Sequence, residues 1–245
     1  MIESENINIQ GIRTGDEMAD IIPELAKSIG TQAVPANERS VPAGGIKTVV
    51  LDIGGVLVGF DFREFIMDKV HDEELTLRII KDTVKSPWWK EYDRGNMTDE
   101  EIMDRFCEGD PEIADIIRST FADIHGMLTR RDETIPWIRA LEQAGYRVLV
   151  LSNYSSRALE GCPEANDFLS YVDGGILSFL DHLIKPDEEI YRLIMERYSL
   201  QPGETVFVDD TVENIDAALA LGWKGVVWHD RVQVENDLHA LGVLW

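Results

Sequence analysis

The stretch that decides the fold is KTVVLDIGGVLV, residues 47–58. It begins with an apolar run rich in β-branched residues, which is typical of a parallel strand buried on both faces. The run ends at Asp52, and the glycine pair Gly54 and Gly55 follows at once. A buried strand that ends in a carboxylate and a tight glycine turn is expected at the carboxyl edge of an open α/β sheet.

Four further runs share this apolar, strand-like pattern, at residues 147–151, 175–178, 205–208 and 224–228. Helical periodicity lies between them at residues 132–144 and 212–221, and a glycine follows each of these stretches. Strands that alternate with helices form parallel sheets, because a crossover helix returns the chain to the same end of the sheet. The predicted fold class is therefore α/β, with a doubly wound parallel sheet.

Between the first two long strands lies an insert, residues 62–127, with helical spacing and no convincing strand. Within it, Thr98 followed by Glu101 is a capping box that begins a helix. The insert leaves the sheet just after the first strand, so we expect a small α-helical cap over the carboxyl end of that strand. The predicted domains are a core of residues 46–61 and 128–245 and a cap of residues 62–127.

Residues 1–45 differ in pattern from the rest of the chain. Residues 16–29 have apolar side chains at helical spacing, whereas residues 31–45 contain two prolines and a glycine pair. We interpret the segment as an N-terminal extension and linker outside the core. Its role and the oligomeric state of the protein stay open at this point.

Composition narrows the classes of partner. The formal net charge is −23, and phosphate backbones bind to clustered Lys and Arg, so nucleic acid is excluded. No apolar run approaches the ~20 residues of a bilayer-spanning helix, and the N-terminus lacks the basic start and apolar core of a secretory signal. Cys107 and Cys162 show no metal-ligand spacing and are expected to be ordinary buried thiols. We therefore expect a cytoplasmic protein that does not bind membranes.

Polar side chains follow the ends of the predicted strands. They are Asp52, Ser152 with Asn153, Lys185 in the loop after the short strand, and the pair Asp209 and Asp210. The carboxyl ends of parallel strands meet at one edge of a sheet. There a carboxylate can attack phosphorus, a hydroxyl and an ammonium can hold phosphoryl oxygens, and an acidic pair can bind a divalent metal. The combination predicts phosphoryl transfer from a small-molecule phosphate ester.

Together these segments resemble the four motifs of the haloacid dehalogenase (HAD) superfamily. They are VLDIGGVLV (50–58), LSN (151–153), KPD (185–187) and FVDD (207–210), and they occur in the family's order. The insert stands where the helical-cap subclass has its cap, which implies a HAD-like Rossmannoid core. The cap stretch YDRGNMT (92–98) further resembles the sugar-phosphatase branch that includes α-glucose-1-phosphate phosphatase. The resemblance implies an Mg²⁺-dependent phosphatase of a small phosphorylated metabolite, with sugar phosphates favoured.

The resemblance also implies which residues act on the metal. Asp52 would be the nucleophile that forms an aspartyl-phosphate, and it would also bind Mg²⁺. Gly54 would offer its backbone carbonyl to the ion. Asp210 would bind the ion directly, and Asp209 directly or through water. Asn214 would support this loop.

A second set of residues would act on the phosphoryl group. Ser152 would donate a hydrogen bond to a phosphoryl oxygen, with Asn153 beside it. Lys185 would neutralise both the nucleophile and the phosphoryl group, so Ser152 and Lys185 are predicted to be catalytic as well as phosphate-binding. Gly55 belongs to the tight turn that is expected to cradle the anion.

Gly54 departs from the family's usual motif, which has a second Asp at that position as general acid and base. Losing a general acid typically costs ~10²–10⁴ in rate. The resembling sugar-phosphatase branch also has Gly there, so the change does not imply inactivity. We expect the best turnover for weakly basic leaving groups, such as sugar 1-phosphates and aryl phosphates, unless the cap supplies an acid. The candidates for that acid are Glu91, Asp93 and Asp99.

Two other functions fit the same motifs. A 2-haloacid dehalogenase uses an Asp nucleophile on carbon without a metal, which Gly54 permits, although the pair Asp209 and Asp210 favours a metal. A catalytically weak protein that binds a phosphorylated ligand or a partner chain is the other alternative.

Individual residues also have structural interpretations. Asp210 with Glu213 fits a helix capping box, although that would not explain Asp209. Three aromatic residues of the insert fit either a substrate pocket or packing between cap helices: Trp88, Trp89 and Tyr92.

Overall fold

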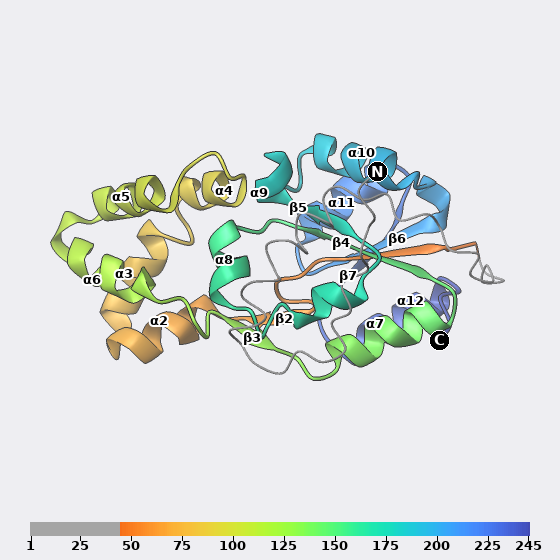
Figure 1. Cartoon of the computed structure of the whole chain (residues 1–245), viewed down its shortest axis with the longest axis horizontal. Helices are drawn as coiled ribbons and strands as arrows, with labels where there is room; N and C mark the ends of the chain where they lie inside the picture. Colours follow the sequence, from red (N-terminus) through yellow and green to blue (C-terminus); the bar gives the residue numbers. More distant parts are fainter. Residues whose placement is uncertain (1–44) are drawn as a thin grey trace, which may run out of the picture.

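The computed structural model describes residues 45–245, in which helices flank a central sheet and a further group of helices lies beside it (Figure 1). The helix predicted at residues 16–29 and the linker up to residue 44 lie outside the described residues.

The central sheet has five parallel strands in the order β5-β4-β1-β6-β7. Their bounds are β1 (Thr48–Leu51), β4 (Arg147–Ser152), β5 (Gly175–Leu177), β6 (Thr205–Asp209) and β7 (Lys224–Val227). Each matches one of the five predicted runs to within one residue at either end, and the parallel α/β sheet is confirmed. The earliest strand lies in the middle, so the chain winds outward from β1 in both directions.

Helices cover both faces of this sheet (Figure 1). On one face lie α7 (Thr134–Gln143) and α12 (Arg231–Ala240), and on the other α10 (Glu188–Tyr198) and α11 (Val212–Ala220). The predicted helices at residues 132–144 and 212–221 are confirmed as α7 and α11 to within two residues at each end. Short elements complete the core: α8 (Ser156–Gly161), η2 (Asp167–Tyr171), α9 (Ser178–Asp181) and η3 (Pro202–Glu204).

Successive residues of β1 point to opposite faces, as the period of a strand requires. Val49 and Leu51 belong to the apolar cluster that includes Leu141 of α7. Val50 belongs to a second cluster, which includes Ile190 of α10. All five side chains are fully buried, so the unbroken apolar run of β1 is explained by burial on both faces.

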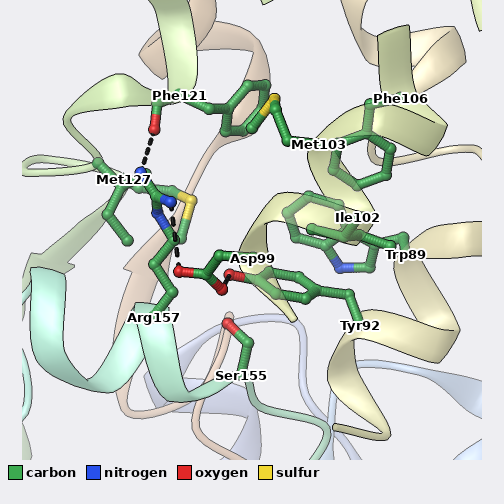
Figure 2. A pocket seen from close by; sticks show the side chains of 11 residues that line it. Trp89, Tyr92, Asp99, Ile102, Met103, Phe106, Phe121, Met127, Ser155 and Arg157 are labelled. Carbon is green, nitrogen blue, oxygen red and sulfur yellow. Dashed lines mark hydrogen bonds and ion pairs between the residues drawn. The ribbon is translucent and has the colours of Figure 1, made fainter. Parts of the chain in front are cut away.

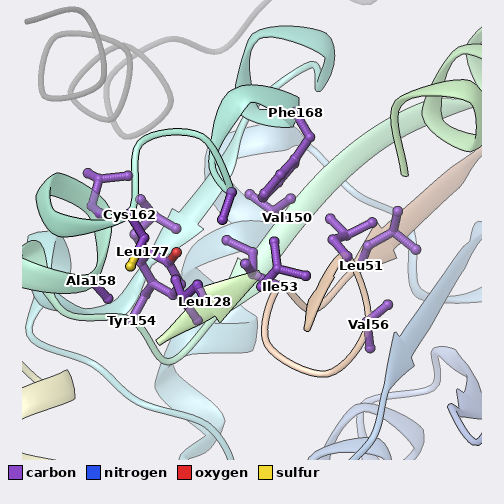
Figure 3. Close-up of a cluster of buried hydrophobic side chains, with 14 of the residues drawn as sticks. Leu51, Ile53, Val56, Leu128, Val150, Tyr154, Ala158, Cys162, Phe168 and Leu177 are labelled. Carbon is purple, nitrogen blue, oxygen red and sulfur yellow. The ribbon is translucent and has the colours of Figure 1, made fainter. Parts of the chain in front are cut away.

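The first cluster continues beyond the sheet, under the loop that follows β1 (Figure 3). Ile53 and Val56 of this loop are buried in the same cluster as Tyr154 and Leu128. Asp52 thus lies between a buried strand and a buried loop, which fixes the position of its carboxylate.

The insert forms a group of helices, which we call the cap. Its helices are α2 (Phe62–Val70), α3 (Glu73–Asp82), α4 (Pro87–Asp93), α5 (Asp99–Gly109), η1 (Pro111–Ile113) and α6 (Ala114–Ala122). The antiparallel pair β2 (Val58–Phe60) and β3 (Leu128–Arg130) joins the cap to the core, and the sequence did not predict these strands. The capping box at Thr98 and Glu101 is confirmed, whereas the domain boundaries at residues 62 and 127 stay a prediction.

Two further expectations concern the whole molecule. Cys107 and Cys162 are buried free thiols, as predicted. Among residues 45–245, no helix is both long and apolar enough to cross a bilayer. The cytoplasmic location stays a prediction.

Candidate active site

The register of the sheet brings the first acidic residues together. Leu51 of β1 pairs with Val150 of β4 and Val208 of β6. Asp52, the next residue, donates its N–H to the Val208 carbonyl at 2.9 Å and therefore lies beside Asp209. The carboxyl ends of β1 and β6 thus carry one carboxylate each at the same edge of the sheet.

A buried lysine bridges these two carboxylates. The Nζ atom of Lys185 lies 2.8 Å from Oδ1 of Asp52 and 2.6 Å from Oδ2 of Asp209. Lys185 is only 2% exposed, Asp52 8% and Asp209 0%. Buried charges of this kind persist only where each is paired, so the ammonium is what allows both acids to lie there.

The carboxylate of Asp209 has further donors. The Nδ2 atom of Asn214 lies 3.0 Å from both of its oxygens, and the Thr211 N–H donates to Oδ1 at 2.7 Å. The supporting contact predicted for Asn214 is therefore present. It ties the beginning of α11 to the end of β6.

Asp210 completes a cluster of three acids. One carboxylate oxygen each from Asp52, Asp209 and Asp210 lies within 4.8 Å of the others. The helix that follows begins at Val212 with Thr211 as its N-cap, so the interpretation of Asp210 as the capping residue is wrong. The carboxylate of Asp210 instead faces the loop after β1.

Gly55 allows that approach. Its φ is +76°, and a Cβ at this position would collide with the Asp210 carboxylate. Its N–H donates to the Val58 carbonyl at 3.0 Å, and its predicted place in a turn that cradles phosphate stays a prediction. The residue is glycine because the backbone conformation and the neighbouring acid both exclude a side chain.

Ser152 at the end of β4 and Asn153 directly after it, both predicted to bind phosphate, lie at the same edge. Ser152 is 1% exposed and hydrogen-bonds Asp52. The side chain of Asn153 is engaged with the main chain of Lys185: Nδ2 donates to the Lys185 carbonyl at 3.0 Å, and Oδ1 accepts from the Lys185 N–H at 2.7 Å. Asn153 thus holds the loop that presents the lysine, and its direct contact with phosphate stays a prediction.

The electrostatics of the cluster are unbalanced. Burial raises the pKa of Asp52 to about 7, Asp209 adds to this, and Lys185 acts against it. Burial and Asp209 also raise the pKa of Asp210. Burial acts to lower the pKa of Lys185, but Asp52 and Asp209 outweigh it and keep the lysine charged. Three carboxylates and one ammonium carry a formal charge of −2, and the oxygens are hard ligands, so the residues present fit one divalent cation.

A cleft between cap and core opens next to this cluster. The charged and amide side chains that line it are Lys85, Lys90, Glu91, Asp93, Arg94, Asn153, Lys185, Glu213 and Asn214. Arg94 of the cap also pairs with Asp187 of the core at 3.2 Å. The cap therefore contributes three cations and two acids to the cleft, and the cations can offset part of the negative charge around an anionic substrate.

A second, largely apolar pocket lies between the cap helices and α8 (Figure 2). Asp99 links the two sides: its Oδ1 accepts from the Tyr92 hydroxyl at 2.7 Å, and its Oδ2 lies 3.3 Å from Nη1 of Arg157. Trp89 lines both this pocket and the cleft, and it stacks on Phe106 with ring centroids 5.9 Å apart. Trp89 and Tyr92 therefore take part in both packing and a pocket, the two roles left open by the sequence.

The family of the chain can now be stated. The model of the haloacid dehalogenase-like hydrolases matches residues 46–222, which include the whole acidic cluster and its lysine. The chain belongs to this family. The predicted HAD resemblance is confirmed at this level, whereas the α-glucose-1-phosphate phosphatase branch stays a prediction.

Similar HAD-like proteins include enzymes and solved structures. A sesquiterpene phosphatase of Aspergillus oryzae is 25% identical over 195 residues, covering 80% of this chain and 96% of that protein. A predicted HAD-like hydrolase of Porphyromonas gingivalis has a TM-score of 0.61 at 21% identity, covering 80% of this chain and 96% of the other. A HAD family enzyme of Bacteroides thetaiotaomicron, solved as an Asp-to-Ala variant with magnesium and inorganic phosphate, has a TM-score of 0.61 at 23% identity, covering 75% and 94%.

One cap residue near the HAD-like site was named from the sequence only as one of three acids. Asp93, at the end of α4, lines the cleft together with Lys185 and Asn153. Its position in the YDRGNMT stretch was the only signal available, because nothing in the sequence states which side of a cap helix faces the core. The structure separates Asp93 from the other two candidates.

We predict that Lys185→Met destabilises the metal-free protein by about 3–5 kcal/mol at pH 8, because it leaves buried carboxylates unpaired. The loss of unfolding free energy relative to wild type should be smaller at pH 5. The pKa of Asp52 is raised to about 7, so at pH 5 this group is protonated and needs no cation. Urea unfolding in EDTA at both pH values measures this. Lys224→Met, which removes an exposed lysine of β7, is the matched control. Equal deficits at the two pH values would contradict the role of Lys185.

Proposed function

We propose that this protein is an Mg²⁺-dependent phosphatase that hydrolyses a small phosphorylated metabolite through an aspartyl-phosphate on Asp52. The observation that carries the proposal is the cluster of Asp52, Asp209 and Asp210 around the buried ammonium of Lys185. The similarity to a sesquiterpene phosphatase supports phosphate-ester chemistry. The magnesium and inorganic phosphate bound to the Bacteroides thetaiotaomicron enzyme support the choice of metal.

In the proposed reaction, some residues orient the nucleophile and others bind the phosphoryl oxygens. Two donors, the Lys185 ammonium at 2.8 Å and the Ile53 N–H at 2.7 Å, bind Oδ1 of Asp52 and orient its carboxylate for attack on phosphorus. The Ser152 hydroxyl and the Lys185 ammonium would hold the phosphoryl oxygens as negative charge shifts towards them.

The metal site would consist of Asp52, Asp209, Asp210 and the backbone carbonyl of Gly54. A bound Mg²⁺ would offset the formal charge of −2 and so permit a phosphoryl group to approach three carboxylates. The dehalogenase alternative has less support, because attack on carbon without a metal gives no reason for Asp210 to face Asp52 and Asp209.

The substrate class we favour is a sugar phosphate. The cleft beside Lys185 is lined by charged and amide groups of both cap and core, including Lys90, Arg94 and Glu213, which can bind hydroxyl groups as well as the phosphate.

A second substrate class is a phosphate ester with an apolar tail. The apolar pocket of Figure 2 shares Trp89 with the cleft, and the similar Aspergillus oryzae protein is a sesquiterpene phosphatase. The pocket has a volume of about 20 Å³, so a tail would enter it only if side chains such as Met103, Phe106 and Met127 moved apart.

Replacing the nucleophile tests the reaction. Asp52→Asn is nearly isosteric but cannot attack phosphorus, so we expect phosphatase activity on p-nitrophenyl phosphate to fall to background while the far-UV circular dichroism is unchanged. Asp115→Asn, an exposed acid on α6 of the cap, is the matched control and should keep wild-type turnover. Wild-type activity in Asp52→Asn would exclude the assigned nucleophile.

Calorimetry tests the metal. Wild-type protein should bind Mg²⁺ at pH 8, and Asp210→Asn should weaken binding at least about tenfold, since even outer contacts of a metal site typically contribute that much. Binding should also weaken as the pH falls through about 7, because protons on Asp52 compete with the ion. EDTA-insensitive activity without Mg²⁺ binding would favour the dehalogenase alternative instead.

A direct comparison decides the substrate class. At saturating Mg²⁺ we expect kcat/KM for glucose 1-phosphate to exceed that for farnesyl phosphate, because the polar cleft offers partners for its hydroxyl groups. Lys90→Met should reduce kcat/KM for the sugar phosphate mainly through KM. A higher kcat/KM for farnesyl phosphate, lowered by Phe106→Ala, would select the apolar-tail class.

A further inference from the structure

The absence of an acid at Gly54 raises the question of what protonates the leaving oxygen. Gly54 lines a small pocket between cap and core, and a Cβ built there would make only ordinary contact with Phe60, at 3.7 Å. The same pocket is lined by Asp93 of the cap and by Asn153 of the core. Asp93 of the cap and a side chain at position 54 of the core would therefore face the same pocket from its two sides.

The other two cap acids are engaged elsewhere. Glu91 accepts from Nδ2 of Asn96 at 3.2 Å and lies 3.5 Å from Nε of Arg94, and it lines the cleft but not the pocket that contains Gly54. Asp99 is bound by the Tyr92 hydroxyl and by Arg157 in the apolar pocket. Of the three, Asp93 alone lines both the cleft with Lys185 and the pocket with Gly54.

The backbone around Asp93 is docked on the core. The Ser178 hydroxyl donates to the Asp93 carbonyl, and Arg94 pairs with Asp187 at 3.2 Å. Gly95, with φ +73°, approaches α9 so closely that a Cβ would lie 2.6 Å from the Phe179 carbonyl oxygen. These contacts at three consecutive residues hold the end of α4 against the core, so the carboxyl group of Asp93 is positioned rather than mobile.

The surroundings of Asp93 favour its protonated form. Burial raises the pKa of Asp93 to about 7, Asp52 adds to the rise, and Lys185 and a hydrogen bond from Trp89 oppose it. A carboxyl group with a pKa near 7 can both give and take a proton near neutral pH.

We propose that Asp93, reaching across from the cap, is the general acid and base that stands in for the missing acid at position 54. Resting on the proposed phosphatase function, it acts as follows. As Asp52 forms a bond to phosphorus and the bond from phosphorus to the leaving oxygen breaks, the Asp93 carboxyl gives its proton to that oxygen, which leaves as an alcohol. The Asp93 carboxylate then takes a proton from the water that attacks the aspartyl-phosphate, and release of phosphate regenerates both side chains.

The test is the dependence of kcat/KM on the leaving group, measured with a series of substituted phenyl phosphates in saturating Mg²⁺. In the wild-type protein, kcat/KM should change only little as the leaving group becomes more basic. Asp93→Asn should lose about 10²–10⁴ in kcat/KM for phenyl phosphate, whose leaving group needs a proton, and little for p-nitrophenyl phosphate, whose leaving group does not. Adding Gly54→Asp to Asp93→Asn should recover the shallow dependence, since the new side chain faces the same pocket.

The controls separate this idea from the proposed function. Asp115→Asn, an exposed acid of the cap, should keep the wild-type dependence. If Asp52→Asn is inactive but Asp93→Asn loses kcat/KM equally for all phenyl phosphates, the role of Asp93 is overturned. The proposed phosphatase function would still stand. A steeper dependence in Glu91→Gln instead would move the role to Glu91. Wild-type turnover in Asp52→Asn would overturn the phosphatase function itself.

Discussion

The buried ammonium of Lys185 is the interaction on which the site depends. Two carboxylates, Asp52 and Asp209, lie on neighbouring strands with almost no exposure to water, and the ammonium lies within 2.8 Å of each. Without it, the adjacent ends of β1 and β6 would repel each other. Asn153, which binds the main chain of Lys185, and Asn214, which binds Asp209, hold the members of this arrangement in place.

The same arrangement leaves charge unbalanced, and that imbalance is the basis of its chemistry. One ammonium cannot neutralise three carboxylates, so burial raises the pKa of Asp52 to about 7 and also raises that of Asp210. In the proposed function, a bound divalent cation would offset this charge and so permit an anionic phosphoryl group to approach. Gly55 contributes to this charge cluster, because the lack of a side chain lets the Asp210 carboxylate lie against the loop that follows Asp52.

In the proposed reaction, the cap supplies the proton donor that the core lacks. The core would supply the nucleophile, a cation and the metal ligands in this reaction, but Gly54 has no side chain that could give a proton. The end of α4 brings Asp93 to the opposite side of the same pocket, and it is held there by Ser178, Asp187 and the close approach of Gly95 to α9.

Local pattern in the sequence determined the sheet and the strand-end residues. Unbroken apolar runs imply strands buried on both faces, and parallel strands align their carboxyl ends, so Asp52, Asp209 and Lys185 could be assigned to one site without coordinates. Other features depended on side-chain direction and on contacts between distant segments, which no local pattern encodes. Asn153 proved to hold the Lys185 loop, Gly55 to make room for Asp210, and Asp210 not to cap a helix. The choice of Asp93 among three cap acids is of the same kind: it follows from how α4 packs on α9, a contact between residues more than eighty positions apart that only the tertiary structure decides.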